Sequence, residues 1–510
     1  MAKKQVVIIG AGIGGLATAN LLAKAGYQVD VFEKNSHAGG RADILKAEGF
    51  TFDMGPSWYL MPEVFEHFYN LMDEDVNVHL DLRRLSPAYK VFFETGDPVT
   101  ITSDQTKDSA TFEAIEPGAG DKLKQYVAGG DAIYQLALRH FLYSNFTSLS
   151  DFTKKDILTR GASMLSLAFT PIDRYVKRFV KNKRLQQILE YPMVFLGTSP
   201  FRAPAIYSLM SALDFRQGVF YPMGGMYTII SSLETIGKNH GVRYHYNNAA
   251  STITTKDGQA TGVTLEDGRH VTADIVISNA DLHFTETVLL SDKDRSYPQR
   301  YWDKLQAGPS ALLLYLGIKG TLPNLEHHTL LFVDDWKENF AAIYDTKTYP
   351  DTASIYICKP SGIDPSVAPN GHENLFVLVP LPPGKDLQLD AQKQLTDRYL
   401  DQIARMIDVP DLRERIVFSQ TFGPNDFMTK FHSWQSTALG PSHVLKQSAL
   451  FRTPNISKKV SGLYYVGGST TPGIGLPMCL IGAELIYKRL SGDKKGGPVN
   501  RIDSISEERA

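Results

Sequence analysis

The chain has 510 residues, a formal net charge of −2, 43% hydrophobic residues and only two cysteines. This length predicts a large core divided among about two to four domains. The near-zero charge gives no basic footprint for nucleic acid, and Cys358 and Cys479 are too few for a disulfide framework or a cysteine-rich metal site. No apolar run reaches the roughly 18 residues that a transmembrane helix needs. We therefore expect a cytoplasmic protein whose contact with a membrane is peripheral.

The N-terminus predicts a strand, a glycine turn and a helix. Residues 6–9 form a short apolar run typical of a buried parallel strand. Gly10, Gly12 and Gly15 follow in the spacing G-x-G-x-x-G and open a helix that runs to about Ala25. In such a turn the first glycine makes the bend, the second lets the backbone approach a pyrophosphate, and the third lets helix and strand pack closely. The free N–H groups at the helix start hold the phosphates.

A second strand, residues 27–33, ends on an acid. Glu33 lies 18 residues after Gly15, which suits a hydrogen bond to the adenosine ribose and disfavours a 2′-phosphate. A signal peptide is one alternative, because Lys3 and Lys4 precede the apolar run, but an uninterrupted hydrophobic segment is missing. A nicotinamide enzyme is the other alternative, and the residues after Glu33 argue against it.

Two further motifs continue the site. Gly39-Gly40-Arg41 follows Glu33, and residues 49–57 end in Asp-Met-Gly-Pro-Ser. This extension resembles the flavin-binding signature of the amine-oxidase and carotenoid-desaturase group of FAD enzymes. In that group the paired glycines and the arginine continue the phosphate site, and the Asp-x-Gly segment passes beside the isoalloxazine ring. The resemblance implies FAD as the cofactor and makes a surface ion pair the less favoured role for Arg41.

The middle of the chain predicts a helix at 62–72 and alternating antiparallel strands within 89–102. Residues 131–220 then mix aromatic, aliphatic and basic side chains. Two interpretations stay open: an ordinary helical region with a solvated charged face, or a basic amphipathic surface that lies on anionic lipid beside the entrance of an apolar tunnel. Six cations within eleven residues form what we call the cation cluster: Arg174, Lys177, Arg178, Lys181, Lys183 and Arg184.

From residue 221 the chain returns to the nucleotide-binding domain. A helix is expected at 227–239 and a buried strand at 273–277. By resemblance to the same family, Ala250 lies beside the adenine and Asn279 lies near the pyrophosphate. The following block, assigned to the substrate domain, predicts strands at 311–318, 354–358 and 375–379 and a helix at 391–407.

The C-terminal motif, residues 462–477, joins a strand, a glycine turn and an apolar helix. The helix start near Leu476 and Met478 suits the stabilisation of negative charge on a reduced flavin ring. The string resembles the signature of bacterial-type phytoene desaturases. It departs from that signature at Thr471, where histidine is commonest, and at Ile474, where a smaller residue is usual.

The resemblance extends over residues 4–490 and implies an α/β fold, in which a Rossmann-like FAD-binding domain of the amine-oxidase and carotenoid-desaturase type carries a substrate domain with a mixed sheet and helices. The predicted FAD-binding segments are 1–88, 221–290 and 416–490, the substrate segments are 89–130 and 291–415, the helical membrane-docking region is 131–220, and a disordered tail is 491–510. The predicted cofactor-binding residues are Gly10, Gly12, Ile13, Gly14, Gly15, Glu33, Lys34, Gly40, Arg41, Gly55, Pro56, Ser57, Ala250, Asn279, Gly468, Leu476 and Met478.

The same resemblance implies FAD-dependent desaturation of a carotenoid precursor, most simply phytoene, toward lycopene by hydride transfer to flavin N5. The expected partners are a hydrophobic polyene, a membrane surface, and a quinone or oxygen as electron acceptor, because there is no second dinucleotide motif. We predict no catalytic side chain and no metal site, and we interpret His327-His328 as a surface pair. The alternatives are a C30 or hydroxycarotenoid desaturase, a carotenoid isomerase or saturase, an amine or protoporphyrinogen oxidase, and a non-enzymatic FAD-binding chaperone.

Overall fold

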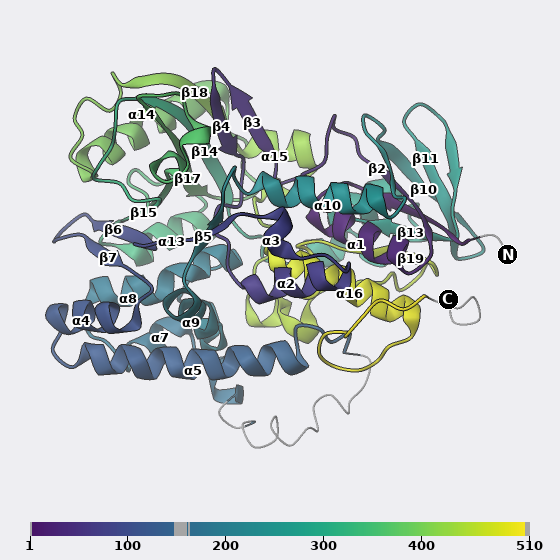
Figure 1. The fold of residues 1–510 in the computed structure, drawn as a ribbon, viewed down its shortest axis with the longest axis horizontal. Helices are drawn as coiled ribbons and strands as arrows, with labels where there is room; N and C mark the ends of the chain where they lie inside the picture. Colours follow the sequence, from purple (N-terminus) through teal and green to yellow (C-terminus); the bar gives the residue numbers. More distant parts are fainter. Residues whose placement is uncertain (1–2, 147–160, 162–163, 505–510) are drawn as a thin grey trace.

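A five-stranded parallel sheet lies on the right of Figure 1, with the strand order β19-β13-β1-β2-β9. The computed structural model describes residues 3–146, 161 and 164–504. Because all the pairings in this sheet are parallel, the carboxyl ends of β1, β2 and β13 meet at one edge. The strands are β1 (Gln5–Ile9), β2 (Gln28–Phe32), β9 (Arg243–His245), β13 (Ile275–Ser278) and β19 (Leu463–Tyr465).

Helices cover one face of this sheet and a small antiparallel sheet covers the other. Helices α1 (Ile13–Lys24), α10 (Tyr227–Asn239) and α16 (Leu476–Ser491) share one hydrophobic core with the strands. All residues of α1 from Ile13 to Leu22 are buried, so this helix has no polar face. Together the layers confirm the predicted Rossmann-like arrangement. The antiparallel sheet consists of β10 (Ala250–Lys256), β11 (Gln259–Leu265) and β12 (His270–Thr272).

The second large sheet has seven strands in the order β18-β14-β17-β16-β15-β6-β7, and only the β15–β6 pair is parallel. Helix α14 (Leu389–Met406) packs on one face through Leu395, Tyr399 and Ile403. The strands and helix predicted for the substrate domain are therefore confirmed. The strands are β6 (Tyr89–Phe93), β7 (Val99–Ile101), β14 (Ser310–Lys319), β15 (His328–Phe332), β16 (Ile355–Cys358), β17 (His372–Leu381) and β18 (Ile416–Phe422).

A layer of helices lies below this sheet in Figure 1 and shares an aromatic-rich core with it. Helix α5 runs without interruption through residue 130, so the domain boundary predicted at that point falls inside a helix. Strand β18 likewise joins the mixed sheet although its residues were assigned to the FAD-binding segment 416–490. The helices of the layer are α4 (Gln105–Ile115), α5 (Ala119–His140), α7 (Ile172–Val176), α8 (Lys183–Glu190) and α9 (Ser208–Gln217).

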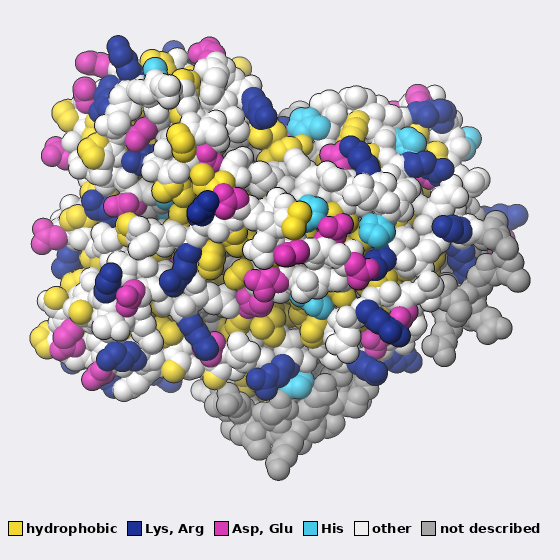
Figure 2. All heavy atoms as spheres, viewed as in Figure 1, with side chains coloured by type: hydrophobic (Ala, Val, Ile, Leu, Met, Phe, Trp, Pro, Cys, Tyr) yellow, Lys and Arg dark blue, Asp and Glu magenta, His cyan; other side chains and the backbone are white. Residues whose placement is uncertain are grey.

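Shorter elements connect these layers, and α2 (Pro62–Leu71) confirms the helix predicted at 62–72. No helix among the described residues combines the length and the apolar character needed to cross a membrane. Lys, Arg, Asp and Glu side chains are interspersed over the face in Figure 2. The remaining elements are β3 (Ile44–Ala47), β4 (Phe50–Asp53), α3 (Val76–His79), β5 (Leu82–Arg84), β8 (Phe220–Pro222), α11 (Leu282–Phe284), α12 (Gln299–Trp302), α13 (Trp336–Tyr344) and α15 (Pro424–Phe431).

Two expectations are wrong. The described part of the predicted disordered tail is held on α16 as far as Asp503, because buried polar groups of α16 take partners from it: the Val499 N–H donates to the Glu484 carboxylate at 2.6 Å, and the Lys488 ammonium donates to the Gly497 carbonyl at 2.8 Å. His327 and His328 are not a surface pair, since they are only 5% and 0% exposed. His327 directly precedes β15, and His328 is the first residue of this strand, whose residues are all buried.

Candidate functional site

One cavity of about 1480 Å³ joins the two sheets. All the predicted cofactor-binding residues except Gly15 line it. Gly15 instead allows close packing, because a Cβ atom there would lie 2.1 Å from the Gly10 carbonyl oxygen. The remaining wall is formed mainly by aromatic and aliphatic side chains from the substrate domain and the helical layer. The cavity therefore has a polar end, built on the parallel sheet, and an apolar end.

The polar end contains a cradle of glycines at the start of α1. A Cβ atom on Gly12 would lie 2.8 Å from the Asn279 side-chain nitrogen, and one on Gly14 would lie 2.6 Å from its side-chain oxygen. Gly10 has a φ of +95°, which a residue with a side chain rarely adopts. Among the described residues, no side chain caps the first N–H groups of α1. These groups therefore face the cavity as donors, which suits a pyrophosphate.

Glu33 lies beside the glycine turn at this end of the cavity. It follows β2 and is buried, and its carboxylate accepts hydrogen bonds from the Ala11 N–H at 2.7 Å and from the Asn35 N–H at 2.9 Å. The carboxylate thus braces the glycine turn while it lines the cavity. Lys34 beside it also lines the cavity, and its ammonium donates to the Thr429 carbonyl at 2.8 Å.

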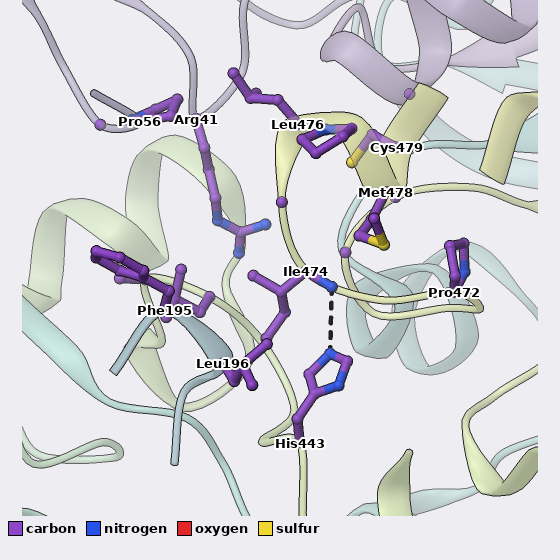
Figure 3. A pocket seen from close by; sticks show the side chains of 18 of the residues that line it. Arg41, Pro56, Phe195, Leu196, His443, Pro472, Ile474, Leu476, Met478 and Cys479 are labelled. Atoms are coloured by element: carbon purple, nitrogen blue, oxygen red, sulfur yellow. Dashed lines mark hydrogen bonds between the residues drawn. The ribbon is translucent and has the colours of Figure 1, made fainter. Parts of the chain in front are cut away.

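Arg41 reaches into the middle of the cavity (Figure 3). Its guanidinium donates to the Ser433 hydroxyl at 2.6 Å and lies 3.8 Å from the Asp281 carboxylate. Burial lowers the pKa of Arg41, and the Asp281 charge opposes that shift. The Nε atom has no hydrogen-bond partner among the described residues, so it remains available to a ligand. Gly55 is required beside it, because a Cβ there would lie 2.4 Å from the Arg41 carbonyl oxygen.

The C-terminal motif faces Arg41 and Pro56 across the cavity in Figure 3. Gly475, with a φ of +120°, turns the chain into α16, whose first residues Leu476 and Met478 line the cavity. This confirms the predicted helix start at this position. Its N-terminal N–H groups carry partial positive charge.

An imidazole that the sequence analysis did not select lies in this wall. His443 Nε2 accepts the Ile474 N–H at 3.3 Å (Figure 3), and its Nδ1 lies 3.0 Å from the Tyr207 hydroxyl. Burial lowers the pKa of His443 well below its usual range, and the Arg452 charge adds to the shift, so the ring is neutral. Thr471, which replaces the histidine common in the signature, donates to Asn455 at 2.5 Å instead. The cavity thus gains an imidazole from a segment without a recognisable motif.

The apolar end reaches the surface at what we call the apolar rim. The rim side chains both line the cavity and are between 50% and 70% exposed, which is unusual for large hydrophobic residues. Deeper in the cavity, Trp58 contacts Phe195 and Tyr191 with ring centroids 5.3 and 5.8 Å apart. The rim consists of Leu165, Phe169, Leu450 and Phe451.

Known proteins share this arrangement. Residues 13–484 match the family described as flavin containing amine oxidoreductase. The chain belongs to this family. The carotenoid 3,4-desaturase of Haloarcula japonica is 41% identical over 491 residues, which cover 96% of this chain and 98% of that protein. The zeta-carotene-forming phytoene desaturase of Myxococcus xanthus is 35% identical over 96% of this chain and 94% of that protein.

Solved structures support the fold alone, because their sequence identities are low. An oxidoreductase from Methanosarcina mazei has a TM-score of 0.57 at 20% identity, with 95% of this chain and 100% of that chain covered. Putrescine oxidase bound to putrescine has a TM-score of 0.58 at 15% identity, with 94% and 96% covered. The α/β fold predicted from the motifs is confirmed.

The cofactor of this family member is FAD, and the chain is an FAD-dependent oxidoreductase of the carotenoid-desaturase type. The site fits that cofactor on structural grounds. Cβ atoms on Gly12 and Gly14 would press on the Asn279 side chain beside the cavity, α1 presents uncapped donors, and Arg41 offers an unpartnered Nε among the described residues. Glu33 lies where an adenosine ribose would be bound in a Rossmann-like fold.

Proposed function

We propose that this enzyme introduces double bonds into a linear carotenoid by FAD-dependent desaturation. The observation that supports this most strongly is the joining of a dinucleotide cradle to a large apolar space within one cavity. A long polyene requires such a space, because each buried CH₂ group contributes ~0.8 kcal/mol. The wall around Trp58, Tyr191 and Phe195 offers aromatic surface on which such a chain can lie.

FAD, when bound, supplies the hydride acceptor that oxidation of a CH₂–CH₂ unit requires. The glycine cradle, Glu33 and Arg41 would bind the cofactor, and the N–H groups of α16 near Leu476 would favour negative charge beside them. The apolar wall would align the substrate and exclude water. His443 accepts the Ile474 N–H through Nε2, and burial lowers the pKa of this imidazole. It therefore adds a polar group to the wall but no charge.

Two substrates compete within this activity. Phytoene is the substrate that the motif resemblance implies, and the 35% identical relative is a phytoene desaturase. The higher identity of 41% to a carotenoid 3,4-desaturase favours a second candidate, in which the enzyme introduces the 3,4 double bond of a carotenoid.

Expression in two carotenoid-producing hosts separates these candidates. One host should accumulate phytoene and the other lycopene, and the extracted pigments are identified by absorption and mass. Loss of two hydrogens per double bond from phytoene supports the first substrate, and the same loss from lycopene alone supports the second. Unchanged pigments in both hosts, from a protein that carries FAD, would contradict the proposed function.

The electrons are expected to pass to a membrane quinone or to oxygen, because the sequence has a single dinucleotide motif. Anaerobic turnover with a lipid-soluble quinone should proceed without a nicotinamide. A stoichiometric requirement for NAD or NADP would contradict this part of the proposal.

A polyene that avoids water must enter from a lipid bilayer, and we place that contact at the apolar rim. The cation cluster was the face predicted from sequence, but part of its charge is used within the protein. Lys177 pairs with Asp173 at 2.7 Å, and Arg184 donates to the Asp97 carbonyl at 2.9 Å. None of its six residues, all of them described, lines the cavity. The cluster therefore remains a second, weaker candidate for the docking face.

A further inference from the structure

Three side chains that bind soft metals gather in the core behind the cavity wall. His327, His328 and Cys358 each offer one ligand atom, and these atoms lie within 4.8 Å of one another. His328 and Cys358 are directly opposite each other on the antiparallel strands β15 and β16. All three side chains are buried. The cluster is separate from the FAD-binding motifs, and none of the three residues lines the large cavity.

The imidazoles of this cluster have unused nitrogens. Both ring nitrogens of His327 lack a hydrogen-bond partner among the described residues. The Nε2 atom of His328 lacks one as well. Buried polar atoms are normally paired, because an unpaired one loses its hydration without replacement. The other nitrogen of His328 is held, since Nδ1 lies 2.7 Å from the Tyr356 hydroxyl. Such a contact fixes the ring and leaves Nε2 free as a ligand.

Packing holds the His328 ring in one orientation. The indole of Trp58 stacks on it with centroids 4.2 Å apart and an interplanar angle of 11°. The His327 ring contacts His328 with centroids 4.5 Å apart and the Tyr221 ring at 4.7 Å. The donors are thus preorganised by aromatic neighbours rather than free to rotate.

Charged groups of both signs surround the cluster. Asp53 is half-buried beside Cys358, and the two residues line a small cavity of about 10 Å³. Asp364 is buried and accepts the Tyr221 hydroxyl at 3.3 Å. The ammonium of Lys359 is engaged by the Leu322 carbonyl at 2.8 Å and by Glu373 at 3.4 Å, so its charge is already matched. The neighbours whose charges act on the cluster are Asp53, Asp364, Lys359 and Glu373.

We propose that His327, His328 and Cys358 bind one zinc ion. Two imidazoles and a thiolate are preferred zinc ligands, and three protein ligands leave a fourth position open. Zinc binds the thiolate, so coordination forms the metal–sulfur bond and releases the Cys358 proton to solvent. The ion would tie β15 to β16 and fix Trp58, which stacks on His328 and lines the large cavity. Its role is therefore to hold one wall of the substrate space.

The test measures metal in the FAD-loaded protein. Zinc content by plasma mass spectrometry should be one ion per chain, or should reach one ion per chain when the chelated protein is titrated with Zn²⁺. Co²⁺ in place of zinc should give a thiolate-to-cobalt charge-transfer band. Cys358→Ser and His328→Gln should each remove both signals. Tyr356→Phe removes the hydroxyl that orients His328 and that also contacts the Ser57 hydroxyl at 2.6 Å, and it should weaken zinc binding by about 10–100-fold.

Matched controls change the same residue types elsewhere. Cys479→Ser and His270→Gln should keep wild-type zinc binding, because neither residue belongs to the cluster. FAD content and thermal unfolding report whether each variant is folded. The proposal is overturned if wild-type protein takes up no zinc in the titration, or if folded Cys358→Ser and His328→Gln bind zinc as tightly as the wild type. The wild-type measurements decide the matter even where a variant fails to fold.

Discussion

The two ends of the cavity are built in different ways. The polar end is made of backbone and a few short-range motifs, with Gly12, Glu33 and Arg41 lying within thirty residues of one another. The apolar end is made of side chains from remote segments, such as Trp58, Phe195 and Phe451. The first end recognises a phosphate-containing cofactor by geometry, and the second accepts a hydrophobic molecule by shape and water exclusion. The difference implies that one substitution at the polar end can abolish cofactor binding, whereas one substitution at the apolar end removes only part of the apolar contact.

The largest effect is expected at the glycine cradle. Gly12→Val should abolish FAD binding, because even its Cβ would lie 2.8 Å from the Asn279 side chain and the larger group would fill the phosphate path. Flavin absorbance of the purified protein measures the loss. Gly129→Ala is the matched control, since its Cβ would meet only the Tyr175 hydroxyl at 3.7 Å. Full flavin occupancy in Gly12→Val would disprove the assignment of the polar end.

The four side chains of the apolar rim should each contribute part of the free energy of binding to a membrane. Changing Leu165, Phe169, Leu450 and Phe451 to Ser should weaken liposome binding by several kcal/mol, because each large apolar side chain contributes about 1.5–3 kcal/mol when fully buried. FAD content should be unchanged. Flotation with anionic liposomes measures the binding.

Two controls decide between the candidate docking faces. Leu389→Ser and Val78→Ser alter apolar residues that are even more exposed than the rim and do not line the cavity, and they should have no effect. Replacing Lys181, Lys183 and Arg178 with Gln tests the cation cluster, where each contact would contribute about 1 kcal/mol and would weaken with salt. If the Gln variant lost more liposome binding than the rim variant, the cation cluster would be the docking face instead of the rim.

Buried carboxyl groups near the apolar end should make stability depend on pH. Burial raises the pKa of Asp214 from 3.8 to about 7 and that of Glu190 from 4.5 to about 8. The folded state therefore holds protons that the unfolded state releases, so stability is greatest below pH 3.8 for these groups and is lost as pH rises toward 8. The loss is on the order of a few kcal/mol for each of the two groups, at about 1.4 kcal/mol for each unit of pKa difference.

The melting temperature measured across that pH range tests this. In the double variant Asp214→Asn, Glu190→Gln, the melting temperature should fall much less as the pH rises, because neither amide titrates. The amide oxygen introduced at position 214 can still accept the Tyr191 hydroxyl, which Asp214 accepts at 2.7 Å. Asp303→Asn, which changes an exposed acid, serves as the control. If the melting temperature of the double variant fell with pH as steeply as that of the wild type, these two carboxyl groups would not cause the pH dependence.

The smallest effect is expected at Glu33. Glu33→Ala should weaken FAD binding by about 1–3 kcal/mol, the range for losing a charged hydrogen-bond partner. The same change frees the Ala11 N–H, which Glu33 accepts at 2.7 Å. Glu33→Gln should lose less, because the amide oxygen can still accept. Titration of apoprotein with FAD measures both, and unchanged affinity in Glu33→Ala would remove this residue from the cofactor site.

The sequence by itself determined the polar end and the type of fold. A glycine turn depends on consecutive residues, so Gly10, Gly12 and Gly15 could be recognised without knowing what packs around them. The same holds for the strands β1 and β2, whose apolar runs are local signals. Even there, the bracing of the turn by Glu33 through the Ala11 N–H became visible only in the structure.

Only the tertiary structure decided the apolar end and the buried polar clusters. His443 enters the cavity from a segment without a motif, and it does so because its partners Tyr207 and Ile474 come from distant parts of the chain. His327 and His328 form a polar pair in the sequence, yet β15 is covered on both faces of the mixed sheet. Side-chain environments arise from long-range packing, and no local pattern of residues specifies them.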